Sequence, residues 1–143
     1  MNLLFFLTPK SDVVYVEDTD SLRQVMERME YHTYQAIPMV NRFGHYAGTI
    51  TEGDILWYIK EHLPFNMKMA ETILIGDVRR KKENLPVSIR ASMEDLMSKV
   101  VNQNFVPVID DKDVFIGIIT RKDVIRYLHG ELQKCQGTQQ QEE

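Results

Sequence analysis

The chain has 143 residues, which is enough for one compact domain or two small units that share a core. Its 43% hydrophobic and 27% charged residues are ordinary for a globular protein. The formal net charge of −4 disfavours a dedicated nucleic-acid-binding protein, because such proteins depend on phosphate neutralisation. The single cysteine, Cys135, excludes an intramolecular disulfide and is typical of a reducing compartment, so we expect a cytoplasmic protein.

The chain opens with an apolar stretch at residues 3–7. This stretch is too short to cross a bilayer, and no basic region precedes it as in a signal peptide. We therefore expect a helical turn or a strand here, and no membrane partner.

The first half of the chain begins with a β-rich run at residues 13–16. Residues 18–21 then supply N-cap groups for a helix. Its apolar positions follow the i, i+3, i+4, i+7 spacing of one helix face: Leu22, Val25, Met26 and Met29.

Two further apolar runs, at residues 36–40 and 46–50, are joined by residues 41–45 in a hairpin-like connection. A second helix follows Thr51, and Pro64 ends it. The first half therefore predicts the order strand, helix, strand, strand, helix.

The second half predicts the same order. A strand at residues 87–89 precedes a helix, two strands at 106–109 and 114–119, and a closing helix that starts after Thr120. Val16 is 22 positions before Pro38, whereas Ile89 is only 18 positions before Pro107. The second half should therefore have a shorter first helix or tighter loops.

These patterns divide the chain into four parts. We expect a first repeat at residues 1–66, a connector at 67–82, a second repeat at 83–132 and a disordered, Gln-rich tail at 133–143. The basic run at residues 79–82 is interpreted as a solvated part of the connector.

The second half repeats the first at an offset of 69 residues. Within residues 37–63 the shift aligns identical residues at Pro38, Gly48, Ile50, Thr51, Asp54, Tyr58 and Leu63. Both copies reach a Thr-x-x-Asp turn where a strand passes into a helix: Thr51 to Asp54, and Thr120 to Asp123.

The Thr-x-x-Asp turn has two interpretations. As a capping box it satisfies free N–H groups at a helix start, and this alone would account for each copy. Its recurrence at two helix N-termini, which attract anions, also fits a binding role. There an aspartate can accept hydrogen bonds from two vicinal hydroxyls, as a ribose presents them.

Several kinds of chemistry have no motif in this chain. No G-x-x-x-x-G-K-[ST] loop, no H-E-x-x-H motif and no G-x-S-x-G elbow is present. The four histidines are scattered, so no metal site is expected. The repeats occupy almost the whole chain, and we therefore expect neither catalysis nor a required cofactor.

Two copies of a hydrophobic-Pro-hydrophobic run followed by Gly-h-h-Thr-x-x-Asp resemble a tandem cystathionine-β-synthase (CBS) domain pair, or Bateman module. The resemblance covers residues 5–132 and extends to stand-alone bacterial CBS proteins. It implies an α+β fold in which two β-α-β-β-α repeats pack through their sheets around a pseudo-two-fold axis.

The resemblance also implies a function. The chain should be a regulatory module that binds an adenine nucleotide, of the AMP, ADP, ATP or cyclic di-AMP class, between the repeats and transmits this to an unidentified partner protein. Asp54 and Asp123 should bind ribose, and Thr51 and Thr120 ribose or phosphate. The residues expected to sandwich the purine are Ile37, Pro38, Val106 and Pro107.

The two turns differ in the residues between Thr and Asp. Arg121 and Lys122 place cations in the second turn, whereas Glu52 places an acid in the first. We predict that a phosphorylated ligand prefers the second site, with possible help from Lys10, Arg79 or Arg80. The first site should take a less charged ligand or stay empty.

Aromatic residues flank the apolar stripe of the closing helices at Trp57, Tyr58 and Tyr127. They suggest a partner surface, and relatives of this kind usually form homodimers through these helices. Burial against the chain's own core is the alternative. A ligand-independent dimerisation or scaffold module is therefore the second functional hypothesis.

Overall fold

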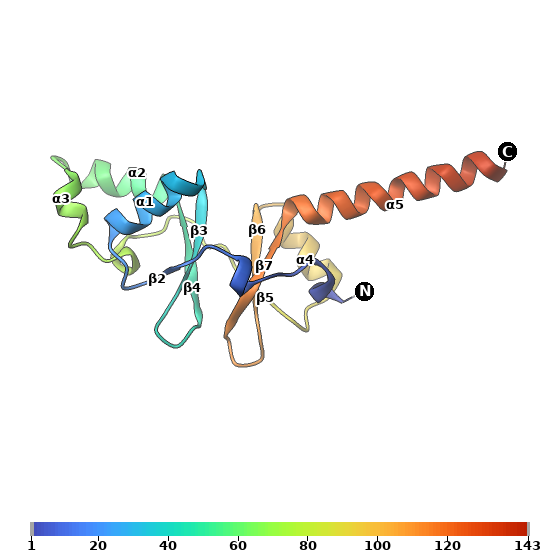
Figure 1. The fold of residues 1–143 in the computed structure, drawn as a ribbon, viewed down its shortest axis with the longest axis horizontal. Helices are drawn as coiled ribbons and strands as arrows, with labels where there is room; N and C mark the ends of the chain where they lie inside the picture. Colours follow the sequence, from blue (N-terminus) through green and yellow to red (C-terminus); the bar gives the residue numbers. More distant parts are fainter. Residues whose placement is uncertain (1, 143) are drawn as a thin grey trace.

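The structure is a computed structural model that describes residues 2–142. Two β-sheets lie side by side at the centre of the molecule (Figure 1). The first sheet has the order β2 (Val16–Glu17), β3 (Ala36–Val40), β4 (Tyr46–Thr51). The second has the order β1 (Thr8–Pro9), β7 (Phe115–Thr120), β6 (Phe105–Ile109), β5 (Val87–Ser88).

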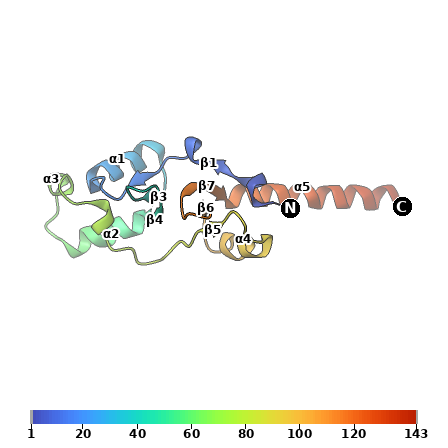
Figure 2. The same cartoon turned by 90° about the horizontal axis from the view of Figure 1, so that it is seen from below.

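Helices cover the outer sides of this pair of sheets, as the two perpendicular views show (Figures 1 and 2). The α-helices are α1 (Leu22–His32), α2 (Glu52–Glu61), α3 (Met67–Ala70), α4 (Met93–Val100) and α5 (Arg121–Glu142). Three short 3-10 turns complete the chain: η1 (Leu3–Phe6), η2 (Lys10–Asp12) and η3 (Ile75–Asp77). The fold is α+β with two related β-α-β-β-α units, as the sequence predicted.

The two units have the same strand register. Ala36 pairs with Thr51 in the first hairpin, and Phe105 pairs with Thr120 in the second, at the same 69-residue offset. Both hairpins carry a register shift near the end of the leading strand. The expected difference in helix length is confirmed, because α1 has 11 residues and α4 has 8.

The packed units differ from the sequence repeats at their boundaries. β1 pairs with β7 of the second unit, and Leu3 and Phe6 lie in the second unit's core. Conversely Ile75 and Val78, which we assigned to the connector, are buried in the first unit's core. Each unit therefore packs the segment that precedes the other unit.

α5 continues as a helix through the segment that was expected to be disordered, up to Glu142, and it extends beyond the rest of the molecule (Figure 1). Gln, Glu and Lys have favourable helix propensities, so a segment without a core-facing stripe can still prolong an existing helix. The last tail residue, Glu143, lies outside the described residues.

The opening apolar stretch forms the turn η1 rather than an independent strand. Its rings of Phe5 and Phe6 meet Tyr127 edge to face at 5.6 and 5.3 Å. Tyr127 thus packs against the chain's own core, which was the alternative to a partner surface. None of the helices within residues 2–142 combines the length and apolar character that a membrane crossing requires.

Candidate functional site

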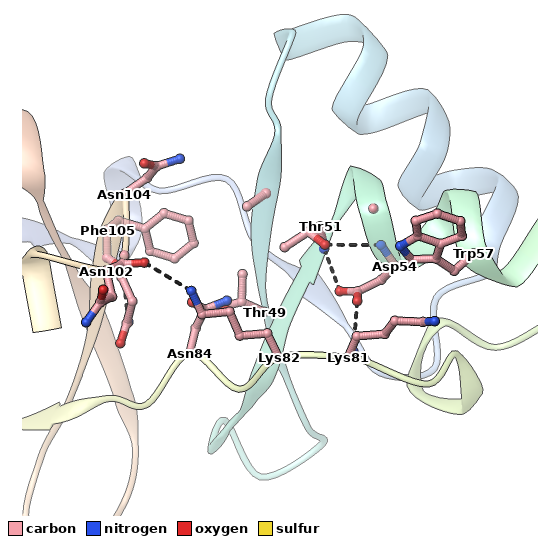
Figure 3. A pocket seen from close by; sticks show the side chains of 13 residues that line it. Thr49, Thr51, Asp54, Trp57, Lys81, Lys82, Asn84, Asn102, Asn104 and Phe105 are labelled. Carbon is pink, nitrogen blue, oxygen red and sulfur yellow. Dashed lines mark hydrogen bonds between the residues drawn. The ribbon is translucent and has the colours of Figure 1, made fainter.

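A cavity of about 280 Å³ lies between the two units beside the Thr51–Asp54 turn, and we call it the first cavity (Figure 3). Its walls come from β4 and α2, from the connector, and from the segment that leads into β6. The lining side chains are mostly polar: Thr49, Thr51, Asp54, Lys81, Lys82, Asn84, Asn102, Gln103 and Asn104, with Ala36, Trp57 and Phe105 as the apolar members.

The Asp54 carboxylate in this cavity is already engaged by backbone donors. Thr51 N–H donates to Oδ2 at 3.0 Å, and Lys81 N–H donates to Oδ1 at 3.1 Å (Figure 3). Thr51 Oγ1 in turn accepts from Asp54 N–H at 3.1 Å, which completes a capping box. Asp54 is only 4% exposed. Its carboxylate therefore caps α2 and ties the connector to the first unit.

The Thr120–Asp123 turn is different. Thr120 Oγ1 accepts from Asp123 N–H at 3.1 Å, as in the first turn. Within residues 2–142, however, no hydrogen bond to the Asp123 carboxylate is found, and this residue is half-buried. Both carboxylate oxygens are therefore available to accept hydrogen bonds from a ligand.

A second cavity of about 320 Å³ lies beside Thr120. Thr120, Thr8, Asp12 and Asn104 are its polar members, and it is otherwise lined by apolar and aromatic side chains: Val13, Val14, Tyr34, Ala36, Pro38, Phe105 and Ile118. The N-terminal segment takes the place here that the connector has in the first cavity. The second cavity thus offers the planar, apolar surroundings that suit a purine.

The two cavities adjoin each other. Ala36, Asn104 and Phe105 line both of them. Ala36 and Phe105 are 69 residues apart and thus equivalent in the two repeats, so the shared wall lies near the pseudo-two-fold axis. A ligand in one cavity can consequently reach groups at the edge of the other.

The residues expected to sandwich a purine differ in whether their side chains face the core or a cavity, because the side chains of a strand alternate between its two faces. Ile37 and Val106 are fully buried in the two cores, and their side chains line neither cavity. Alternate residues of a strand point to opposite faces, which leaves the neighbouring positions facing the cavities. Pro38 lines the second cavity, whereas Pro107 is buried and lines neither. Ile37 and Val106 thus face the cores, and their contact with a purine stays a prediction.

The charges beside the two turns also differ from the expectation. Glu52 faces a separate groove with residues of α1, because residues two apart on a helix point to nearly opposite sides. Lys81 and Lys82, which line the first cavity, make it the more basic of the two. Glu52 therefore does not line the first cavity, and the preference of a phosphorylated ligand for the second site stays a prediction.

The cations of the second turn are placed as follows. The Arg121 guanidinium donates to Asn104 Oδ1, and Arg121 N–H donates to Asn104 O at 2.9 Å. Arg121 is half-buried and contacts Asn104 of the shared wall, but it lines neither cavity itself. Lys122 is exposed and lines neither cavity.

The three other candidate phosphate ligands lie away from the second cavity. The Lys10 ammonium is 5.0 Å from the Tyr15 ring, and the Arg80 guanidinium packs against Gly48. Arg79 is exposed on the connector.

Sequence reasoning missed most residues that the connector and the N-terminal segment contribute. Lys81, Lys82 and Asn84 line the first cavity, and Asp12 and Val13 line the second. Both groups come shortly before the first strand of a unit, β5 or β2. The position shortly before the first strand of each repeat is therefore the sequence signal by which these lining residues could have been predicted.

Tyr46 supports, from the sheet side, the segment that follows the connector. Its hydroxyl donates to Asn84 O at 2.6 Å and lies 2.7 Å from Thr49 Oγ1. Burial raises the pKa of Tyr46 to about 12, so the hydroxyl stays protonated and remains a donor at neutral pH. Asn84, at the edge of the first cavity, is held in place by this bond.

The CBS domain profile matches residues 7–61 and 75–130, which together make up most of the chain. The chain therefore belongs to the CBS-domain family, in a tandem arrangement.

A solved structure of CbpB in complex with c-di-AMP has 27% sequence identity to this chain and a TM-score of 0.86, covering 96% of this chain and 91% of that one.

Two curated relatives from Methanocaldococcus jannaschii are enzymes. L-aspartate semialdehyde sulfurtransferase is 32% identical over 110 residues, 77% of this chain, and inosine-5'-monophosphate dehydrogenase is 25% identical over 115 residues, 80% of this chain. The chain spans about a fifth of the length of each, 20% and 21%.

Proposed function

We propose that the chain is a regulatory module that binds an adenine nucleotide between its two CBS repeats and passes this signal to a partner protein. The role is one of binding, without a catalytic step. The observation that carries the proposal is the second cavity, whose lining includes an apolar wall and Thr120. Thr120 Oγ1 accepts from Asp123 N–H, so the unengaged Asp123 carboxylate belongs to the helix start beside this cavity. The similarity to CbpB, which was solved with c-di-AMP, supports the same ligand class.

The proposed arrangement follows from the chemistry of the two cavities. The purine lies against the apolar side chains of the second cavity, and the ribose hydroxyls donate to Asp123. The phosphate extends toward the shared wall, where Arg121 contacts Asn104 and Lys82 Nζ lies 3.5 Å from Asn102 O. The proposal keeps the predicted preference for the second site. The sequence prediction based this preference on the cations of the second turn, whereas the proposal bases it mainly on the unengaged Asp123 carboxylate.

A thermal-shift screen tests the ligand class. AMP, ADP, ATP, cyclic di-AMP, S-adenosylmethionine and NAD are compared with GMP as a matched purine control. A ligand at a hundredfold excess over its dissociation constant should stabilise the fold by about 2.7 kcal/mol. Stabilisation by adenine nucleotides alone would support the proposal, and a flat response to the whole set would contradict it.

The second hypothesis, a homodimerisation module, is favoured by one observation. α2 and α5 expose apolar side chains, including Leu56 at 56%, Ile125 at 57% and Leu132 at 57%. A second copy of the chain would cover such a surface. Sedimentation with and without nucleotide separates the hypotheses, because a ligand-independent scaffold forms the same dimer in both conditions. The cytoplasmic setting inferred from Cys135 belongs to both proposals.

A further inference from the structure

A third cavity, of about 290 Å³, lies between α2 and the connector, and we call it the outer cavity. It is lined by Trp57, Tyr58 and Glu61 of α2 and by Arg79, Arg80 and Lys81 of the connector. Trp57 and Lys81 also line the first cavity. The outer cavity is therefore a distinct space that adjoins the repeat interface through these two side chains.

The outer cavity has an excess of positive charge. Three cations face a single carboxylate, Glu61, in a protein whose formal net charge is −4. Lys60 and Lys82 flank the cavity in the chain. The ion pairs found within residues 2–142 include none of these five cations. Unpaired like charges at such spacing repel one another, and an anion between them would relieve this repulsion.

Two of the cationic groups are held in place without an acidic partner. The Arg80 guanidinium packs so closely on Gly48 that an added Cβ there would overlap it. The Lys81 backbone is tied to Asp54 Oδ1 at 3.1 Å, and its ammonium lies 5.1 Å from the centre of the Trp57 ring (Figure 3). Groups that are already positioned lose little freedom when an anion binds, which favours affinity.

The Trp57 ring adds an amphipathic wall. The Lys60 ammonium lies 5.4 Å from its centre, so two cations compete for this one indole. Trp57 is 40% exposed, which leaves part of its surface open to a ligand. An anion that draws Lys81 away from the indole would change the surroundings of the ring.

We propose that the outer cavity binds the phosphate or pyrophosphate group of a small phosphorylated metabolite, at a site separate from the nucleotide site of the second cavity. Guanidinium groups make charge-assisted, often bidentate hydrogen bonds to phosphate oxygens. A phosphate monoester carries about −1.5 to −2 charges at neutral pH, which matches the excess of cations over Glu61. Lys81 lines both the outer cavity and the first cavity. An anion in the outer cavity would therefore contact the connector that forms one wall of the first cavity.

The chain supplies its own reporter, since Trp57 is the only tryptophan. Tryptophan fluorescence is measured while sodium pyrophosphate, and separately inorganic phosphate, is added at constant ionic strength set with sodium chloride. We expect a saturable change with pyrophosphate. The dissociation constant should rise about tenfold in Arg79→Gln, because one charge-assisted contact is lost.

Two further variants make the test decisive. Lys81→Gln keeps the backbone bond to Asp54 and should weaken pyrophosphate binding as Arg79→Gln does. Lys68→Gln removes the same charge from exposed α3, lines none of these cavities, and should leave binding unchanged. A response that does not saturate, or that is equal in wild type and both connector variants, would overturn the proposal.

The outcome is independent of the nucleotide site. Asp123→Asn should leave the pyrophosphate response intact, because Asp123 does not line the outer cavity. If Asp123→Asn abolished the response, the anion would be binding in the second cavity and the outer site would be refuted. Circular dichroism confirms that each variant is folded before titration.

Discussion

The Thr51–Asp54 and Thr120–Asp123 turns occupy equivalent places in the two repeats, but their carboxylates have different partners. Asp54 accepts from Thr51 N–H and from Lys81 N–H and is almost fully buried. The carboxylate of Asp123 accepts no hydrogen bond from the described part of the chain. The two turns thus share a sequence motif, but the first carboxylate ties the connector to the first unit and the second has no partner among the described residues.

The segments before each unit show the same divergence. In the second unit, β1 pairs with β7, and Thr8 O lies against Gly117. In the first unit, the matching position beside Gly48 holds the Arg80 side chain instead of a paired strand. One sheet edge is closed by backbone, and the other by a flexible side chain.

The largest expected effect on unfolding free energy distinguishes the two sheet edges. Gly117 has φ +155° and Gly48 has φ +139°, so alanine at either position strains the backbone by about 1–3 kcal/mol. Gly117→Ala should lower the free energy of unfolding by at least about 3 kcal/mol, because its Cβ also displaces β1. Gly48→Ala should cost only the backbone strain, since Arg80 can move aside. Urea denaturation measures both, and equal losses would contradict the comparison.

Asp54→Ala should have the next largest effect, a loss of about 2–3 kcal/mol in unfolding free energy. The cap contributes about 1 kcal/mol, and the charge-assisted bond to Lys81 N–H contributes about 1.5 kcal/mol. The matched control is Asp95→Ala, which removes the acid of the complete Ser92–Asp95 capping box on α4 without affecting the connector. Similar losses in the two variants would show that Asp54 only caps.

Tyr46→Phe makes the first unit resemble the second, which has Phe115 at the equivalent position. The lost hydroxyl bonds to Asn84 and Thr49 should cost about 1 kcal/mol at neutral pH, measured by urea denaturation.

The pKa of Tyr46 gives this prediction a pH dependence. Its pKa is raised from 10.0 to about 12, so the protonated form is favoured in the fold. The stabilisation is fully present below pH 10 and is lost as the pH rises towards 12. Relative to Tyr46→Phe, wild type should therefore lose stability in that window. A difference between them that is constant with pH would contradict the assignment.

Asp123→Ala should have the smallest effect on stability, below about 1 kcal/mol, because the carboxylate makes no hydrogen bond within the described residues. The substitution should instead weaken the binding of the ligand. Titration calorimetry with an adenine nucleotide that binds wild type should show at least a tenfold loss of affinity. Unchanged affinity would return the second turn to plain helix capping.

Much of the fold was predictable because it repeats locally. The prolines at 38 and 107 and the Thr-x-x-Asp turns fixed the alignment of the two hairpins, and strand register followed from it. The shorter α4 was also predictable, from the spacing between Ile89 and Pro107. These features depend on contacts between neighbours in the chain.

The features that were not predicted depend on distant contacts or on the facing of side chains. The pairing of Thr8 with Ile118 joins the two ends of the chain, and no local pattern reveals it. Residues 36–40 have no polar alternation, so the sequence does not show that Ile37 faces the core and Pro38 the cavity. Lys81 and Lys82 are exposed, as the sequence predicted, but the path of the connector that brings them to the first cavity is a tertiary property.

The exchange of preceding segments has a consequence for protein synthesis. The core of the first unit is complete once Val78 has left the ribosome, since Ile75 and Val78 are its last buried members. Leu3 and Phe6 are made before the first unit, yet their partners Ile119 and Val124 are made only after it. Vectorial folding therefore leaves this apolar segment without its partners until β7 and α5 have been made. The core of the second unit closes when a segment that precedes the first unit docks onto it.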